Sequence, residues 1–459
     1  MIKPTFIIVL LFYYSSYIHG ITLEDAVDLA LMQNRSLQSS RLSVKQSTYT
    51  KRSAFSNILP KINLSSTMIH LDGGTFDKMK MGYNYSYSRY IAETALGIPS
   101  KPPDSVYQRT YMTKLTVTQP IWNGGVIWHG YRMAKLAEDV SKVQHKSNRI
   151  ALQYNVASVY FSLLKMQELL KVNKQSLIKS RTNLRTTQTQ VLAGTAIRSD
   201  LLQYKVKVLE KEKDLLITKN TISILKTKWR NLLGLKPSAD IPMPDAVSLL
   251  KYKQEIMQYA SWDNNEVEQA WLEQKNKVLK SNPNIILLKE KVHLSKLAYR
   301  STLGSFSPTL NFSWTKTIEQ DEKLDFKGDG SWNVALALSV PIFNGSSRIW
   351  NVAKSKTAID QAELNRADGE ANILIGAKNA FITMINAAKQ LVISEQSLKN
   401  AKIQYKQIHD LHRAGMTTIS KLIDADIILY GSEMSLSSSR YDFVLARLAW
   451  LQFLNKGVR

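Results

Sequence analysis

The chain between Gly345 and Leu454 contains no proline, and its apolar residues recur at every third or fourth position. This spacing predicts an α-helix with one apolar stripe, close in period to a coiled-coil seam. The stripe before the break consists of Ala377, Phe381, Met384, Ala388, Leu391, Leu398, Tyr405 and Ile408. A helix from Gly345 to Leu411 would be about 100 Å long. Gly415 then fits a tight left-handed reversal, so we expect residues 344–455 to form a long helical hairpin.

The same pattern occurs twice. A shift of 221 positions superimposes residues 120–233 on the second hairpin without a gap, and a shift of 248 relates shorter segments ahead of each hairpin. The matches include Asn123 with Asn344, Gly194 with Gly415, Trp229 with Trp450, Asn34 with Asn282 and Pro60 with Pro308. Such self-similarity indicates a tandem duplication. We expect a first repeat at 21–245 with a helical hairpin at 123–233, a connector at 235–270, and a second repeat at 265–459.

Two segments in each repeat alternate apolar with polar residues, which predicts β-strands. The strands form β-hairpins at 60–120 and 308–343. Residues 71–108 are rich in Gly, Tyr, Pro and Ser and are expected to form a long exposed loop, whereas the corresponding loop at about 318–330 is shorter. The predicted fold class is therefore mixed α and β, dominated by long helical hairpins, with four β-strands per chain.

Each predicted strand has about ten residues and one apolar face, which is the signature of a strand in an outer-membrane barrel. An open sheet edge is not tolerated in lipid, because its N–H and C=O groups would lack partners. Bacterial barrels need at least about eight strands. Four strands cannot close a barrel, so several copies of the chain must each contribute a sheet.

The first twenty residues have the pattern of a secretory signal, which we place at residues 1–20. Lys3 supplies the positive start, the apolar core follows, and small or polar residues lead to Gly20. No later run has the roughly 20 apolar residues of a transmembrane helix. The chain has no cysteine, which excludes disulfides and a lipid-modified N-terminal cysteine. We therefore expect an exported protein that is not a lipoprotein.

The charge and the motifs exclude several classes of function. The net charge is +24, but the lysines and arginines are scattered along the helices, which favours a solvated surface over nucleic-acid binding. No phosphate-binding loop, nucleophile elbow or zinc-protease motif is present. His409 and His412 are three positions apart, without a third ligand at matching spacing, which favours a solvated pair over a metal site. We expect no enzyme activity, no cofactor and no metal.

The whole mature chain resembles the TolC-like family of outer-membrane efflux proteins. The resemblance rests on the order and spacing of individually weak motifs, namely Leu23-Glu-Asp-Ala-Val-Asp-Leu-Ala-Leu-Met-Gln-Asn34, Asn282-Pro-Asn-Ile285, Gln119-Pro-Ile-Trp-Asn-Gly-Gly125, Val340-Pro-Ile-Phe-Asn-Gly345, Leu232-Leu-Gly234 and Phe453-Leu-Asn455. It implies a homotrimer with one transmembrane barrel of twelve strands in the lipid of the outer membrane, continued by an α-helical barrel across the periplasm.

The resemblance also implies a function. The chain would be the exit duct of a tripartite efflux pump or a type I secretion system, coupled to an inner-membrane pump or ABC transporter. The tips of the hairpins would dock onto a periplasmic membrane-fusion adaptor. The tip residues are Ala193, Gly194, Thr195, Ala414, Gly415 and Met416.

In such relatives, rings of aspartates narrow the periplasmic entrance just after the tip glycines. Asp200 lies at the first such position, six residues after Gly194. In the second repeat Lys421 occupies the corresponding position, and an aspartate follows three residues later. The lysine favours mixed-charge pairing over a purely acidic ring. The alternative is that these residues are solvated caps of the returning helices. The candidate gate residues are Asp200, Asp424, Lys421, Thr417 and His412.

Two further hypotheses concern how the hairpin tips open and which class of protein the chain belongs to. Polar residues such as Glu395 would interrupt the seam of the hairpin and allow the tips to shift. The alternative class is an exported, soluble coiled-coil scaffold or adhesin, in which the alternating strands are ordinary half-buried hairpins.

Overall fold

A computed structural model describes residues 20–100, 102, 107–321 and 330–457. The expected signal peptide lies outside these residues, apart from Gly20. The chain divides into two compact units. The first consists of Met1–Val44, Val140–Lys289 and Asn365–Arg459, and the second of Lys45–Asp139 and Glu290–Leu364. Each unit therefore draws on both sequence repeats.

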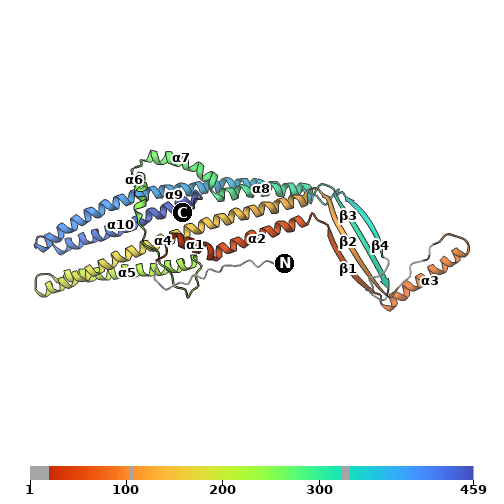
Figure 1. Cartoon of the computed structure of the whole chain (residues 1–459), viewed down its shortest axis with the longest axis horizontal. Coiled ribbons are helices and arrows are strands. Elements are labelled where there is room, and N and C mark those ends of the chain that lie inside the picture. The colour runs from red at the N-terminus through yellow and green to blue at the C-terminus, as the bar shows by residue number, and fades with distance from the viewer. Residues whose placement is uncertain (1–19, 101, 103–106, 322–329, 458–459) are drawn as a thin grey trace, which may run out of the picture. The chain divides into compact units, whose positions relative to one another are not determined.

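The structure confirms the two predicted helical hairpins (Figure 1). The first consists of α4 (Val126–Leu192) and α5 (Arg198–Leu232), and the second of α9 (Ser347–Arg413) and α10 (Ile419–Phe453). Every bound of the second hairpin lies 221 positions after its counterpart in the first. The remaining helices are α1 (Leu23–Gln33), α2 (Arg35–Ser56), α3 (Gly73–Ala95), η1 (Leu249–Tyr252), α6 (Lys253–Ser261), α7 (Asn264–Ser281) and α8 (Pro283–Gly304). None of the described helices combines the length and apolar character needed to span a membrane.

Two buried asparagines explain part of the repeated pattern. Asn34 Oδ1 accepts a hydrogen bond from the Leu37 backbone at the start of α2, and its Nδ2 donates to the Leu232 carbonyl at the end of α5. Asn282 Oδ1 accepts from the Asn284 backbone in α8, and its Nδ2 donates to the Phe453 carbonyl at the end of α10. Each side chain thus satisfies an orphan N–H at one helix start and an orphan C=O at another helix end.

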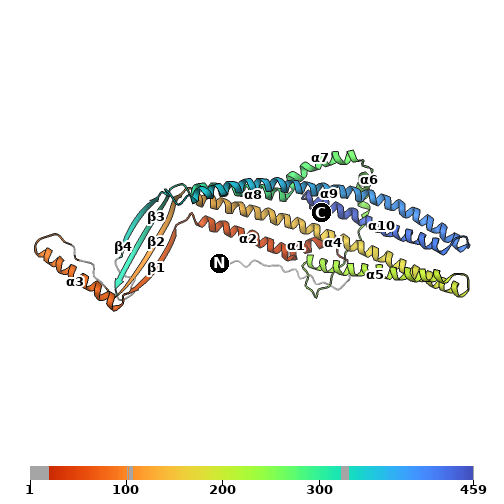
Figure 2. The same cartoon turned by 180° about the vertical axis from the view of Figure 1, so that it is seen from behind.

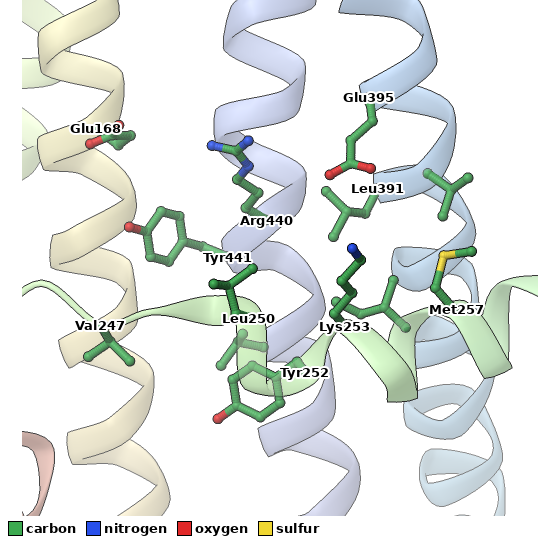
Figure 3. Close-up of a pocket in the computed structure, with 13 residues that line it drawn as sticks. Glu168, Val247, Leu250, Tyr252, Lys253, Met257, Leu391, Glu395, Arg440 and Tyr441 are labelled. Atoms are coloured by element: carbon green, nitrogen blue, oxygen red, sulfur yellow. The ribbon is translucent and has the colours of Figure 1, made fainter.

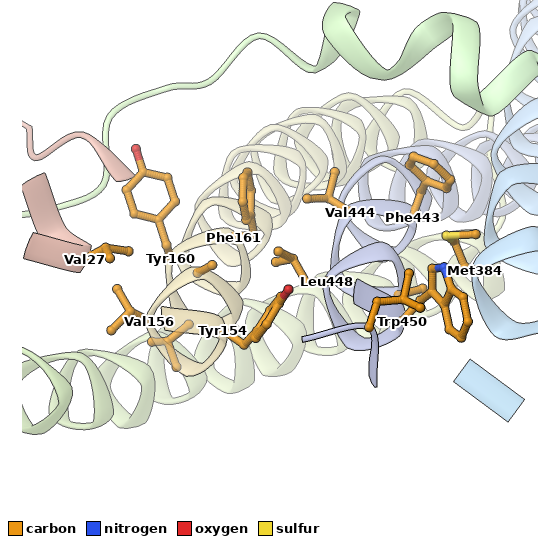
Figure 4. Packing of buried hydrophobic residues seen from close by; sticks show 14 of the residues in the cluster. Val27, Tyr154, Val156, Tyr160, Phe161, Met384, Phe443, Val444, Leu448 and Trp450 are labelled. Atoms are coloured by element: carbon orange, nitrogen blue, oxygen red, sulfur yellow. The ribbon is translucent and has the colours of Figure 1, made fainter. Parts of the chain in front are cut away.

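The core of the first unit is built from aromatic and aliphatic residues of the helices and the connector (Figure 4). Phe381 and Trp450 pack with their ring centroids 5.0 Å apart, and Tyr160 lies edge-on to Trp229 at 6.0 Å. The Trp229 indole donates to the Pro242 carbonyl at 2.9 Å. The connector is therefore fastened to the helices by hydrogen bonds as well as by apolar burial.

The second unit contains one antiparallel sheet in the order β1-β2-β3-β4 (Figure 2). Its strands are β1 (Lys61–His70), β2 (Arg109–Asn123), β3 (Thr309–Asp321) and β4 (Ser331–Ser339). All four predicted strands are present. β3 continues past Ile318, where the shorter loop was expected to begin, and residues 322–329 of that loop lie outside the described residues.

The strand register places mainly apolar rows on one face of the sheet and polar rows on the other, with Lys316 on the mainly apolar face. One cross-strand row contains Ile62, Val117, Trp314 and Val334. The adjacent row contains Asn63, Thr116, Thr315 and Asn333. Because successive residues of a strand point to opposite faces, these two rows belong to opposite sides of the sheet. The strands at both edges, β1 and β4, have one neighbour each in the described chain.

The expectation of a long loop at 71–108 is wrong, because this segment contains α3 (Figures 1 and 2). Asp72 caps the helix by accepting from the backbone N–H groups of Gly74 and Thr75. The apolar residues recur at helical spacing, which the high content of Gly, Ser and Tyr obscured. The stripe consists of Phe76, Met79, Tyr83, Tyr87 and Tyr90.

Candidate functional site

The tips of the two helical hairpins have the same backbone geometry. Gly194 and Gly415 adopt φ values of 72° and 73°, the left-handed conformation that glycine tolerates best. In the first tip the Thr195 N–H donates to the Gln190 carbonyl at 2.8 Å, and in the second the Met416 N–H donates to the Leu411 carbonyl at 2.9 Å. These bonds close both helix ends in the pattern of a Schellman motif. The predicted reversals are therefore confirmed.

The structure places the three charged candidate gate residues near the beginning of the returning helices, His412 at the end of α9 and Thr417 in the turn. Asp200 is partly buried in the first turn of α5, where a carboxylate complements the helix dipole. Lys421 and Asp424 are exposed on α10. His412 Nδ1 lies 3.3 Å from the Thr417 carbonyl, which joins two of the candidates across the turn. Within the described part of the chain, no ion pair links Asp200, Lys421 and Asp424 to one another.

A buried ion cluster farther along the hairpins was not predicted. It joins Lys179 of α4, Lys207 of α5 and Asp426 of α10. Lys179 Nζ lies 2.7 Å from Asp426 Oδ1, and Lys207 Nζ bonds Asp426 Oδ2. The side chains of Lys207 and Asp426 are 5% and 8% exposed, so neither charge is well solvated. Lys179 Nζ also lies 3.6 Å from the centre of the Tyr405 ring of α9, which brings all four long helices into one cluster.

Opposing effects set the charge of Asp426. Burial favours the neutral acid, but the nearby Lys207 and Lys179 ammonium groups outweigh it, so the pKa of Asp426 lies below its ordinary value. Burial also disfavours the charged form of Lys179, and its bonds with Asp426 and Tyr405 raise the pKa of Lys179 overall. Asp426 and Lys179 are therefore ionised at neutral pH, and the carboxylate lies between the ammonium groups of Lys179 and Lys207.

A second polar contact between the hairpins lies close to this cluster. Tyr430 of α10 donates to Asn173 Oδ1 at 2.7 Å and also lies 3.1 Å from Asp214 Oδ2. Lys211 Nζ lies 3.1 Å from the centre of the Tyr430 ring. Burial and the proximity of Lys207 lower the pKa of Lys211, despite the opposing charge of Asp214. The two hairpins are thus joined within the chain by buried polar groups and not by an apolar seam alone.

The sequence contained a signal for this cluster. Leu422, Ala425 and Leu429 form the buried stripe of α10, and Asp426 occupies a position on the same stripe. A carboxylate in a helical seam needs a charge partner.

The structure differs from the expectation for Glu395, which was expected to interrupt the seam of α9. Glu395 is exposed, and its neighbour Ser394 is the buried polar residue. Ser394 Oγ lies 3.1 Å from Ser439 Oγ of α10.

A groove of about 450 Å³ lies between the connector and the helices of the first unit (Figure 3). Its apolar surface includes Leu391 and Met257. Its charged residues have both signs and come from different helices, so the lining favours no ligand of one charge sign. These residues are Glu168, Lys253, Glu395 and Arg440. In the described ranges, no group of three or more His, Asp or Glu side chains is arranged to hold a metal ion.

A family profile and individual proteins of known sequence both match this chain. The profile of the family described as "Outer membrane efflux protein" matches residues 26–235 and 276–455. The solvent efflux pump outer membrane protein SrpC of Pseudomonas putida is 23% identical over 322 residues, which is 68% of this chain and 64% of that protein. The chain therefore matches just under two thirds of the length of this relative.

Two further similarities cover more of the chain. The outer membrane protein TolC of Escherichia coli (strain K12) is 22% identical over 388 residues, covering 81% of this chain and 73% of that protein. Among solved structures, the outer membrane protein VceC of Vibrio cholerae superimposes with a TM-score of 0.75 at 14% identity, covering 95% of this chain and 97% of that chain. The predicted fold class is therefore confirmed, including the four-stranded sheet and the long helices.

Proposed function

Because this chain belongs to the outer membrane efflux protein family, we propose that it forms the exit duct of a tripartite efflux pump or a type I secretion system. The protein is located in the outer membrane and extends into the periplasm. In the proposed function it conducts substrates passively, without catalysis or a cofactor. Energy comes from an inner-membrane pump or ABC transporter, through a periplasmic adaptor.

One observation carries this proposal, which is the division of the sheet into two faces. The apolar row through Ile62, Val117, Trp314 and Val334 suits contact with lipid, and the polar row through Asn63, Thr116, Thr315 and Asn333 suits a water-filled lumen. In an ordinary soluble hairpin the apolar face would be covered by the rest of the chain. Here Ile62 and Leu336 remain 69% and 63% exposed.

The free edges of the sheet support a homotrimer. In lipid, the unpaired backbone groups of β1 and β4 would each be left without a hydrogen-bond partner. We infer that β1 of one copy pairs with β4 of the next, so that three copies supply the twelve strands of one closed barrel.

The hairpin tips suit the proposed docking of an adaptor. They end in the exposed turns at Ala193, Gly194, Thr195, Ala414, Gly415 and Met416. Large apolar side chains are exposed in and beside these turns, including Leu192 at 83% and Met416 at 74%. Exposed apolar groups of this kind are typical of surfaces that bind a partner protein.

The proposed gate is formed by residues near these tips. Asp200, Asp424 and Lys421 would meet their counterparts in the neighbouring copies, with Thr417 and His412 beside them. Because the three charged residues do not pair within one chain, their proposed partners lie across the threefold axis. Mixed-charge pairing there would hold the entrance closed.

Single-channel recording of the purified protein in planar bilayers tests the duct and the gate together. The wild-type protein should insert and show a small conductance, which Asp424→Ala should increase. Glu210→Ala, at an exposed position on α5, is the matched control and should leave conductance unchanged. An unaltered conductance in Asp424→Ala would contradict the gate assignment. A monomeric protein that never inserts and needs no detergent would instead support the soluble scaffold or adhesin.

A further inference from the structure

Helix α3 has an aromatic face that the described chain covers only in part. Five of its apolar residues recur at intervals of three or four and so lie on one side of the helix. They are Phe76, Met79, Tyr83, Tyr87 and Tyr90. None of the residues of α3 is buried; Met79 and Tyr87 are 50% and 41% exposed, and Phe76, Tyr83 and Tyr90 are partly covered. The opposite side carries Lys78, Ala92 and Arg89, together with Tyr85 and Met81, which are 76% and 72% exposed.

The start of α3 is tied to the end of the sheet. β1 ends at His70, and α3 begins three residues later at Gly73. The Leu71 N–H donates to the Gln108 carbonyl, which extends the pairing of β1 with β2 by one step. The first turn of the helix is therefore held at the end of the strands that is farther from α2 and α4 (Figures 1 and 2). In a sheet that crosses the outer membrane, this end is the outer rim.

The chemistry of the aromatic face distinguishes between possible partners. Three of its five residues are tyrosines, whose rings are apolar and whose hydroxyl groups need a hydrogen-bond partner when buried. In a bundle of α3 helices from neighbouring copies, these hydroxyls would be buried in a seam that favours Leu, Ile and Val. At a membrane surface the ring enters the boundary of the acyl chains while the hydroxyl stays among the headgroups.

Three of the tyrosine rings lie next to one another along α3. The rings of Tyr83 and Tyr87 stack at 5.7 Å with 19° between their planes, and Tyr90 follows at 6.0 Å from Tyr87. Lys80 Nζ lies 5.9 Å from the centre of the Phe76 ring, at the margin of the same face. Aromatic residues on one face with a cationic residue at its margin are also found in helices that bind a membrane interface.

We propose that α3 lies on the outer surface of the outer membrane, with Phe76, Met79, Tyr83, Tyr87 and Tyr90 in the boundary between headgroups and acyl chains. Each copy of the chain then has a lipid-bound arm of about 35 Å at the rim of its sheet. The inference rests on the proposed function, because it requires the sheet to cross that membrane. Its partner is a lipid surface and not a second copy of the helix.

Site-directed fluorescence tests this arrangement, and the absence of native cysteine makes single labels specific. Tyr83→Cys, Tyr90→Cys and the opposite-face control Ala92→Cys are labelled with bimane in the full-length protein. The assembly is placed in nanodiscs of phosphatidylcholine and phosphatidylglycerol that contain phosphatidylcholine with a shallow doxyl group. The probes at positions 83 and 90 should be quenched by the doxyl lipid roughly twofold or more over the probe at 92, and iodide should give the reverse order.

A label on the sheet distinguishes an error in the placement of α3 from an error in the proposed function. Leu336→Cys reports from the exposed apolar face of β4 and should be quenched by a doxyl group deeper in the acyl chain. If this probe responds to lipid while all three α3 probes respond only to iodide, the position of α3 is wrong and the duct stands. If the probe at 336 is insensitive to lipid, the proposed function itself fails. Pyrene excimers between copies labelled at position 83, without lipid quenching, would show that the helices bind one another and would overturn the inference.

Discussion

Asp426 occupies a seam position of α10 that would ordinarily hold an apolar residue, and lysines from two other helices compensate its charge. Replacing such a cluster by apolar groups can be neutral, whereas removing one partner leaves a buried charge uncompensated. The cluster is therefore a sensitive point in the contact between the two hairpins. The strength of this contact depends on the charge of the Asp426 carboxylate.

Asp426→Asn should loosen the contact between the hairpins. The substitution leaves Lys207 buried beside Lys179 without the carboxylate that pairs with both, at an expected cost of roughly 3–5 kcal/mol. Hydrogen exchange followed by mass spectrometry should show a loss of protection of about a hundredfold or more in the first turns of α10, since 1.4 kcal/mol corresponds to about tenfold. Glu210→Gln on the exposed side of α5 is the matched control. Equal protection in both variants would show that the cluster contributes little.

The same contact should weaken in acid. The pKa of Asp426 is lowered in the folded protein, so its contribution to stability is complete above the pKa of an unfolded aspartate, about 3.9, and is lost as the pH falls through the folded value. The ratio of protection between wild-type protein and Asp426→Asn should therefore be largest near pH 7 and should fall as the pH drops below about 3.9, the pKa of an unfolded aspartate. Because both proteins are compared at one pH, intrinsic exchange rates cancel. A ratio that stayed constant over this range would assign the effect to packing.

At the level of single residues, the sequence predicted turns better than charge partners. The tip glycines were found because a left-handed turn between two helices favours glycine at one position. The partners of Asp426 are separated from it by more than 200 positions, and helical periodicity within one segment does not show which faces meet. The exposed candidates Lys421 and Asp424 were found through the resemblance alone, and their role remains a proposal.

At the level of the helices, the side chains of Asn34 and Asn282 each form hydrogen bonds that connect the end of one helix to the start of another. Asn282→Ala should lower the free energy of unfolding by about 1–2 kcal/mol because α8 loses its N-terminal cap. The lost hydrogen bond to the Phe453 carbonyl should cost about 1 kcal/mol more. Thermal unfolding followed by circular dichroism would measure the change. Asn264→Ala, at the exposed start of α7, is the matched control and should have little effect.

A second variant separates the two roles of this asparagine. Asn282→Asp keeps the oxygen that accepts from the Asn284 backbone and removes the amide that donates to α10. We expect it to fall between wild-type protein and Asn282→Ala in thermal stability. If it unfolds like the wild type, the cap is the main contribution of the side chain and the bond to α10 is dispensable.

The success of the sequence in predicting elements followed their length and regularity. The helices of the two hairpins have 67 and 35 residues, so their periodicity outweighs local exceptions. α3 was missed because its 23 residues contain three glycines and an unusual number of tyrosines, which favoured a loop by composition. Its spacing of apolar residues and the cap at Asp72 were visible in the sequence. Periodicity was the better guide there than composition.

For the molecule as a whole, the duplication and the strand count led to the same conclusion as the structure. Four antiparallel strands leave β1 and β4 at the edges, and no other described strand covers them. Chain length and periodicity predicted this incompleteness, but the number of copies came from the resemblance. Physical closure requires only that neighbouring sheets meet edge to edge.

Cysteine crosslinking tests the closure by three copies. In one chain, β1 and β4 are separated by three strand spacings, about 14 Å, whereas a disulfide requires Cα atoms within about 7 Å. Chains that carry Asn63→Cys together with Asn333→Cys, Ala335→Cys or Ala337→Cys can therefore crosslink only between copies. For the pair in the correct register, oxidation in membranes should give bands that end at three chains on a non-reducing gel. Asn63→Cys alone, the control, should remain monomeric, because no other β1 lies beside it. Bands beyond three chains would contradict the trimer, and monomers from all three pairs would show that neighbouring copies do not close the sheet.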